Sequence, residues 1–150
     1  MSRIHKSIEV NVPVRTAYNQ WTQFEEFPKF MQGVVEVEQL DDTHVHWVAQ
    51  IAGRRKEWDA EITEQVPDRR IVWRAQQGTP NAGMVSFESV HGHTRIDLEM
   101  RYDPQNLAEQ VGDILGLASR QVESDLKRFK EFIESRGEET GAWRGQVPPA

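Results

Sequence analysis

Seven short segments of this chain alternate between apolar and polar residues with a period of two, and one long segment with helical apolar spacing follows them. Such alternation is typical of β-strands that bury one face. It is clearest in the seventh segment, where Ile96, Leu98 and Met100 are separated by the charged residues Asp97 and Glu99. Seven such strands joined by tight turns predict an antiparallel sheet with one face in water.

Two short helical segments separate the first predicted strand from the other six. The first strand runs from Ile4 to Val12, and Pro13 then suits the first turn of a helix, where no N–H donor is needed. The second helical segment is rich in apolar residues, namely Phe24, Phe27, Phe30 and Met31. The later strands begin after Gly33, and their apolar positions are Val35, Val37, Val45, Trp47, Ala49, Ile51, Trp58, Ala60, Ile62, Ile71, Trp73, Ala75, Val85, Phe87, Ile96, Leu98, Met100 and Tyr102.

A long helix follows the predicted sheet. Asp103 and Pro104 begin it, with the aspartate as N-cap, and it is expected to end near Arg136, where a glycine follows. Its apolar residues form one stripe: Leu107, Val111, Ile114, Leu115, Ala118, Val122, Leu126, Phe129 and Ile133. We expect one domain over residues 1–136 and a loosely held tail over residues 137–150.

The composition excludes several classes of function. The chain has no cysteine, so disulfides, thiolate nucleophiles and cysteine-ligated zinc are absent. Its formal net charge of −6 repels phosphate backbones, so no nucleic-acid partner is expected. The N-terminus has no apolar signal-peptide region, and no segment is apolar over the roughly 18 residues that span a bilayer. A cytoplasmic location is therefore expected.

The predicted order of elements resembles the helix-grip fold of START-like domains, the SRPBCC superfamily. The local sequences are similar to its polyketide cyclase/dehydrase branch, which includes coenzyme-Q-binding proteins. The matching stretches are Ser7–Val10, Ala17–Trp21, Phe27–Met31, Trp47–Ala49, Glu57–Ile62, Arg70–Arg74 and Asp125–Lys130. The likeness extends to Gly141–Gly145, which is similar to a tail in an uncharacterised bacterial subgroup.

This resemblance implies an α+β fold in which a curved, seven-stranded antiparallel sheet grips the C-terminal helix around a cavity. Better-known members of the superfamily bind lipids, quinones, polyketides or other bulky hydrophobic molecules there. The residues expected to bind such a ligand are Trp47, Trp58, Trp73, Phe87, Met100, Tyr102, Leu115, Val122, Phe27 and Phe30. For any single one of them an ordinary packed core is the favoured alternative, and for the phenylalanines of the short helical segments a hydrophobic plug is favoured over a gate.

No motif in the sequence identifies a catalytic, metal or cofactor site. His44 and His46 share one face of a predicted strand, but a zinc site needs a third and usually a fourth ligand, which the sequence does not offer. Charged strand residues such as Arg95 and Asp97 indicate a solvated face crossed by opposite-charge pairs. We therefore assign no catalytic residue, metal or cofactor, and Tyr102 is the one inward-facing phenol predicted.

Three functions fit these features, and the first is favoured. It is a non-catalytic binding or carrier protein for a bulky hydrophobic small molecule, such as a quinone, a lipid or a polyketide-like aromatic. The second is a polyketide cyclase/aromatase or dehydratase, which needs polar groups that project into the cavity. The third is a macromolecular interaction module whose Trp143 contacts a protein or a membrane transiently. Docking of Trp143 onto its own domain is favoured over such a contact.

Overall fold

The computed structural model of the chain describes residues 2–51, 53–78, 81–102 and 112–148. Its elements, in chain order, are β1 (Ser2–Val10), α1 (Val14–Trp21), the 3-10 helix η1 (Phe24–Lys29), β2 (Val34–Gln39), β3 (His44–Ile51), β4 (Arg54–Val66), β5 (Arg70–Gly78), β6 (Asn81–Val90), β7 (His93–Tyr102) and α2 (Gly112–Arg136). This order confirms the predicted α+β helix-grip fold.

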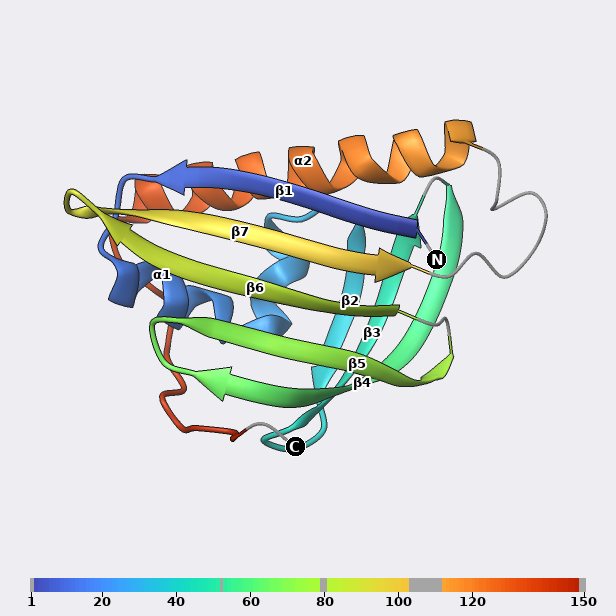
Figure 1. Cartoon of the computed structure of the whole chain (residues 1–150), viewed down its shortest axis with the longest axis horizontal. Helices are drawn as coiled ribbons and strands as arrows, with labels where there is room; N and C mark the ends of the chain where they lie inside the picture. Colours follow the sequence, from blue (N-terminus) through green and yellow to red (C-terminus); the bar gives the residue numbers. More distant parts are fainter. Residues whose placement is uncertain (1, 52, 79–80, 103–111, 149–150) are drawn as a thin grey trace.

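The strands form one antiparallel sheet in the order β1-β7-β6-β5-β4-β3-β2. The strands from β2 to β7 follow one another as a meander, and β1 pairs with β7 from Ser2 opposite Tyr102 to Val10 opposite Thr94. Figure 1 shows the sheet curving, so that β2 and β3 run across the direction of β6 and β7 while α2 lies along β1. The three helices therefore lie on one side of a curved sheet.

Irregular pairing of β4 contributes to this curve. β4 is 13 residues long, and its register with β5 shifts between Asp59 and Ala60 and again between Ile62 and Glu64. An unpaired extra residue bends a strand and increases its local twist. The bent strand carries the sheet from the β5–β6 region round to β3 and β2.

The hydrophobic core lies between the sheet, α1, η1 and α2. At the η1 end it consists mainly of aromatic rings in edge-to-face contact, such as Trp21 and Phe27 with centroids 5.4 Å apart at 79°. Trp21 also lies 5.0 Å from Phe129 of α2. The stripe of α2 continues this packing through Leu126 and Ile133, which are buried. Rings packed this way place positive edges against negative faces.

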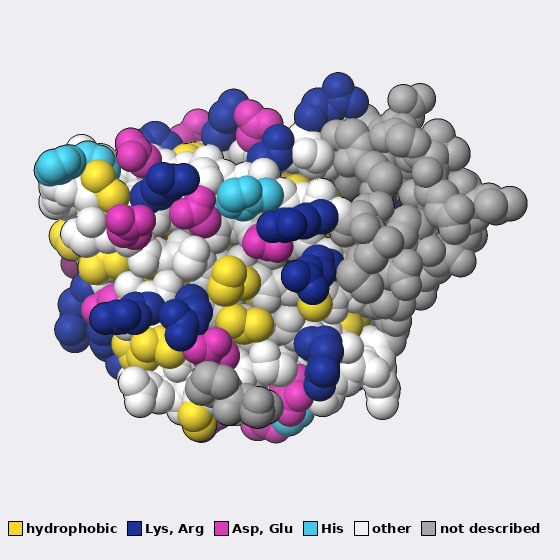
Figure 2. Space-filling view, viewed as in Figure 1, with side chains coloured by type: hydrophobic (Ala, Val, Ile, Leu, Met, Phe, Trp, Pro, Cys, Tyr) yellow, Lys and Arg dark blue, Asp and Glu magenta, His cyan; other side chains and the backbone are white. Residues whose placement is uncertain are grey.

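The outer face of the sheet is charged with both signs. Arg3 of β1 pairs with Glu99 of β7 at 2.9 Å, and Arg70 of β5 contacts Glu64 of β4 at 2.7 Å. Figure 2 shows basic and acidic side chains interspersed over this face. The predicted solvated face with opposite-charge pairs is therefore present, and exposed pairs of this kind contribute at most about 1 kcal/mol each.

α2 ends at Arg136, as predicted. Gly137 follows with φ 73°, in the left-handed region that favours glycine, and its N–H donates to the carbonyl of Ile133 at 2.9 Å. This bond satisfies one of the carbonyls that a helix end leaves without a partner. The predicted helix start at Asp103 and Pro104 lies outside the described residues.

The tail after α2 is bound to the domain, which corrects the expectation of a loosely held segment. Arg144 makes hydrogen bonds of 2.9 and 2.8 Å to the carboxylate of Asp68 and one of 2.6 Å to Oδ1 of Asn19. Gln65 and Val147 exchange two backbone hydrogen bonds, of 2.8 and 3.0 Å. Asn19 is a buried polar residue. The tail supplies its side chain with a hydrogen-bond partner, which a buried polar group requires.

Candidate functional site

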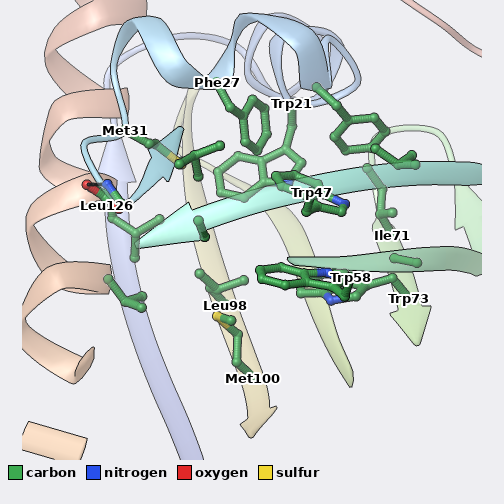
Figure 3. Close-up of a pocket in the computed structure, with 18 of the residues that line it drawn as sticks. Trp21, Phe27, Met31, Trp47, Trp58, Ile71, Trp73, Leu98, Met100 and Leu126 are labelled. Atoms are coloured by element: carbon green, nitrogen blue, oxygen red, sulfur yellow. Dashed lines mark hydrogen bonds between the residues drawn. The ribbon is translucent and has the colours of Figure 1, made fainter. Parts of the chain in front are cut away.

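A cavity of about 160 Å³ lies between the sheet, the two short helices and α2. Figure 3 shows side chains from the short helices, the strands and α2 converging on it. Its walls are almost entirely apolar. The lining residues are Ile4, Trp21, Phe24, Phe27, Met31, Gly33, Val34, Val45, Trp47, Ala49, Trp58, Ala60, Ile62, Ile71, Trp73, Leu98, Met100, Gln121, Val122, Asp125 and Leu126.

The strands place an aromatic wall on one side of this cavity. Trp47 and Trp58 are directly opposite each other in the β3–β4 register, and their rings stack with centroids 6.3 Å apart and planes 11° apart. Trp73 of β5 lies on the same wall, opposite Gly83 of β6. A Cβ on Gly83 would lie 2.3 Å from the indole of Trp73, so only glycine at this position leaves room for the ring.

The indole N–H groups of this wall differ in their partners. Nε1 of Trp73 donates to Oδ1 of Asn81 at 3.4 Å. Nε1 of Trp58 is buried and has no acceptor among the described residues. A buried donor without a partner costs roughly 1–3 kcal/mol, so Trp58 is held in place by its packing and not by a hydrogen bond.

The short helices form a second wall of the cavity. Trp21 comes from the end of α1, Phe24 and Phe27 from η1, and Met31 from the segment after η1. Phe24 and Phe27 lie 5.9 and 5.6 Å from the ring of Trp47, both in edge-to-face geometry. The two walls are therefore in direct contact, and they close one end of the cavity.

The third wall comes from α2 and carries the polar groups. Val122 and Leu126 present apolar side chains, whereas Gln121 and Asp125 present an amide and a carboxyl group. Asp125 is only 8% exposed, and its Oδ2 accepts a hydrogen bond from the N–H of Gly33 at 3.2 Å. Burial raises the pKa of Asp125 to about 6, because a low-dielectric environment disfavours the charged form.

Gly33 allows the chain to approach α2 at this point. A Cβ at Gly33 would lie 2.2 Å from Nε2 of Gln121 and 2.7 Å from Oδ2 of Asp125. Nε2 of Gln121 also donates to the backbone carbonyl of Gln50 at 2.5 Å. These contacts tie the start of β2 and the end of β3 to the polar side of α2.

The sequence-based candidates fall into three groups. Trp47, Trp58, Trp73, Met100, Val122 and Phe27 line the cavity. Phe30 and Phe87 are buried in the core outside its lining, where Phe30 packs against Phe129 at 5.5 Å and Phe87 against Tyr18 at 5.4 Å. The side chains of Tyr102 and Leu115 lie outside the described part of the structure.

The sequence prediction did not include the polar residues of the cavity. Asp125 lies three residues after Val122 and four before Phe129, so it falls within the apolar stripe of α2. A carboxylate at such a position is a signal for a buried polar group, because charged residues are rarely buried without a partner. Gln121 gave no comparable signal, since glutamine is common on exposed helix faces.

The histidines of β3 lie on the opposite face of the sheet from Trp47. Nδ1 of His46 lies 2.5 Å from the carboxylate of Asp59, and Nε2 lies 3.3 Å from that of Glu57. The hydrogen bond with Asp59 is the main cause that raises the pKa of His46. His44 similarly contacts Asp41 at 2.9 Å. These side chains belong to the charged outer face and take no part in the cavity.

The fold is the helix-grip fold of START-like proteins. A START superfamily protein from Mycobacterium smegmatis is similar with a TM-score of 0.72 and 16% identity, over 89% of this chain and 98% of that one. An aromatase/cyclase from Streptomyces sp. R1128 is similar with a TM-score of 0.73 and 13% identity, over 95% of this chain and 99% of that one. At these identities the likeness concerns the fold.

Sequence comparison identifies the family. Residues 10–131 match the family described as polyketide cyclase / dehydrase and lipid transport. The chain is also 54% identical, over 98% of its length and 99% of the relative's, to an uncharacterized 17.2 kDa protein of Streptomyces lincolnensis. The chain therefore belongs to the polyketide cyclase/dehydrase family. In its described part, no helix is long and apolar enough to cross a membrane.

Proposed function

We propose that this protein binds or carries a hydrophobic small molecule in the cavity between the sheet and α2. The observation that carries the proposal is a cavity of about 160 Å³ with almost entirely apolar walls in the core of the domain. Protein interiors seldom leave voids larger than a water molecule, and a void of this size removes packing energy unless a guest fills it. Membership of the polyketide cyclase/dehydrase family supports the same function.

The size of the cavity favours a compact aromatic ligand. An engineered cavity of about 150 Å³ with apolar walls binds benzene, whereas pockets for drug-sized ligands occupy about 300–1,000 Å³. The space of about 160 Å³ therefore suits one ring with small substituents, such as a quinone-type head group. A lipid chain or a long polyketide would require the walls to move apart. The stacked indoles of Trp47 and Trp58 give the wall a flat aromatic surface.

A cavity-filling substitution tests this proposal. Ala60 is 1% exposed and lines the cavity, so Ala60→Leu places three further carbon atoms in the space that the ligand would occupy. We expect wild-type protein to show saturable changes in tryptophan fluorescence with small aromatic ligands at micromolar concentration, and Ala60→Leu to lose at least tenfold in affinity. Ala142→Leu makes the same change at an exposed position and serves as the control. Equal binding by all three proteins would contradict the proposal.

A second candidate function is an aromatase/cyclase or dehydratase. The observation that favours it is Asp125, a titratable group on the cavity wall whose raised pKa of about 6 suits proton transfer near neutral pH. Its test is incubation of a short linear poly-β-ketone thioester with wild-type protein and Asp125→Asn. Cyclisation with loss of water in the wild type alone would support this function. Identical product mixtures would exclude it.

The third function, a macromolecular interaction module, has less support. The backbone N–H of Trp143 donates to Oγ1 of Thr22 at 3.1 Å, and its side chain is half-buried. The neighbouring Arg144 is bound by Asp68 and Asn19. The tail therefore uses its polar groups within the domain, which favours docking of Trp143 over a role in binding a partner.

A further inference from the structure

We propose that Asp125, with Gln121 beside it, is the polar anchor of the cavity and selects an aromatic ligand that carries a hydroxyl group, as in a phenol or an enol. This inference rests on the proposed function, because it names the ligand class for the same cavity. The ligand's ring would lie among the indoles, and its O–H would donate to the carboxylate of Asp125.

The placement of polar atoms supports a hydrogen-bond donor on the ligand. Among the described lining residues, only Gln121 and Asp125 carry an amide or carboxyl side chain. Nε2 of Gln121 uses one of its two N–H groups to donate to the carbonyl of Gln50 at 2.5 Å, and its Oε1 is an acceptor. An ionised carboxylate is also an acceptor only. On the α2 side of the cavity, Oε1 of Gln121 and the carboxylate of Asp125 therefore offer acceptors to a ligand, whereas Nε1–H of Trp58 on the aromatic wall is a donor.

Among the described residues, the partners of Asp125 leave part of its acceptor capacity unused. Its two oxygens lie 3.2 and 3.5 Å from the same N–H of Gly33, and the N–H of Gln32 contributes further. A carboxylate has about four acceptor positions, and buried polar groups are normally satisfied. An asparagine would accept from the same backbone groups without the energy needed to bury a charge. A purely structural role therefore does not account for the carboxylate.

The charged surroundings of Asp125 are simple. The backbone N–H groups of Gln32 and Gly33 face it from the segment before β2, and Arg128 on α2 is the one charged side chain among the causes of its shifted pKa. Gln121, one turn earlier, is neutral. Protonation near pH 6 therefore converts the acceptor carboxylate into a neutral group. In the described part of the chain, no histidine and no second carboxylate contributes to the shift of this pKa.

A matched pair of ligands tests the inference. In 4-ethylphenol and 4-ethyltoluene a hydroxyl replaces a methyl group of similar size, so the pair differs mainly in hydrogen bonding. We expect Asp125→Asn to weaken binding of 4-ethylphenol at pH 8 by about fivefold to tenfold, since a charge-assisted hydrogen bond is about twice as strong as a neutral one. Binding of 4-ethyltoluene should change by less than about twofold. Glu131→Gln removes the same charge from an exposed position on α2 and is the control.

A pH series on the wild-type protein is an independent measurement that needs no variant. Calorimetric titration should show weaker binding of 4-ethylphenol at pH 5 than at pH 8, and no such loss for 4-ethyltoluene. Equal losses for both ligands in Asp125→Asn, or binding of 4-ethylphenol that is independent of pH and of Asp125, would overturn the anchor while leaving the cavity as a binding site. Failure of both ligands to bind wild-type protein would overturn the proposed function as well.

Discussion

Asp125 shows how one residue links the stability of the fold to the chemistry of the cavity. It occupies a stripe position of α2 and is 8% exposed, yet it carries a titratable carboxyl group. The backbone N–H groups of residues 32 and 33 lower its pKa and burial raises it, and burial has the larger effect. The ionised form is therefore held at a cost in stability. Such a cost is common where a group serves function.

This cost predicts a pH-dependent effect of Asp125→Asn on stability. The folded pKa is about 6 and the ordinary value is 3.8, so between these values the folded state keeps a proton that the unfolded state has released. The free energy of unfolding of the wild type therefore falls as pH rises from about 4 to about 6 and stays lower above it. Because asparagine does not ionise, the free energy of unfolding of Asp125→Asn should not fall in this way, which amounts to a gain of up to about 3 kcal/mol relative to the wild type above pH 6.

Urea unfolding at pH 4 and pH 7.5 measures this difference. The variant should gain stability relative to wild type at pH 7.5 and not at pH 4. Glu131→Gln, at an exposed position of the same helix, should show the same small effect at both values. A stability difference between Asp125→Asn and wild type that does not change with pH would contradict the assigned cause.

At the scale of elements, the tail acts as a strap across α1 and the β4–β5 turn. Arg144 contacts Asn19 of α1 and Asp68 of the turn, and its guanidinium lies 5.6 Å from the centre of the Tyr18 ring. Tyr18 is fully buried and packs against Phe87. The strap therefore covers the end of the core from which α1 supplies Trp21 to the cavity wall.

Removing the strap's main contact should destabilise this end of the molecule. We expect Arg144→Ala to lower the free energy of unfolding by about 1–3 kcal/mol, because Asn19 loses a partly buried hydrogen bond and Asp68 loses a bidentate partner. Hydrogen exchange should be faster in α1. Arg120→Ala, at an exposed position, is the control. Equal stability of the two variants would show that the contacts of Arg144 contribute nothing to stability.

The elements differed in how far the sequence predicted them. Strand parity identified the wall formed by Trp47, Trp58 and Trp73, because a period of two fixes which side chains share a face. The end of α2 followed from Gly137. The docking of the tail and the contact of Gly33 with α2 depend on which distant segments meet. No local pattern contains that information.

At the scale of the whole molecule, a curved sheet, two short helices and one long helix surround a space that the described side chains do not fill. The curve depends on the irregular pairing of β4, and the cavity depends on small residues such as Ala49 and Ala60 on its walls. Larger residues at those positions would complete the core and increase packing energy. A bound ligand therefore explains the unfilled space.

Native mass spectrometry of protein purified from cells without denaturation tests this central claim most directly. We predict a population with added mass that corresponds to a small aromatic molecule, released under denaturing conditions and absent from Ala60→Leu prepared in the same way. Protein that carries no added mass, and that acquires none when small aromatic molecules are supplied at micromolar concentration, would contradict the account.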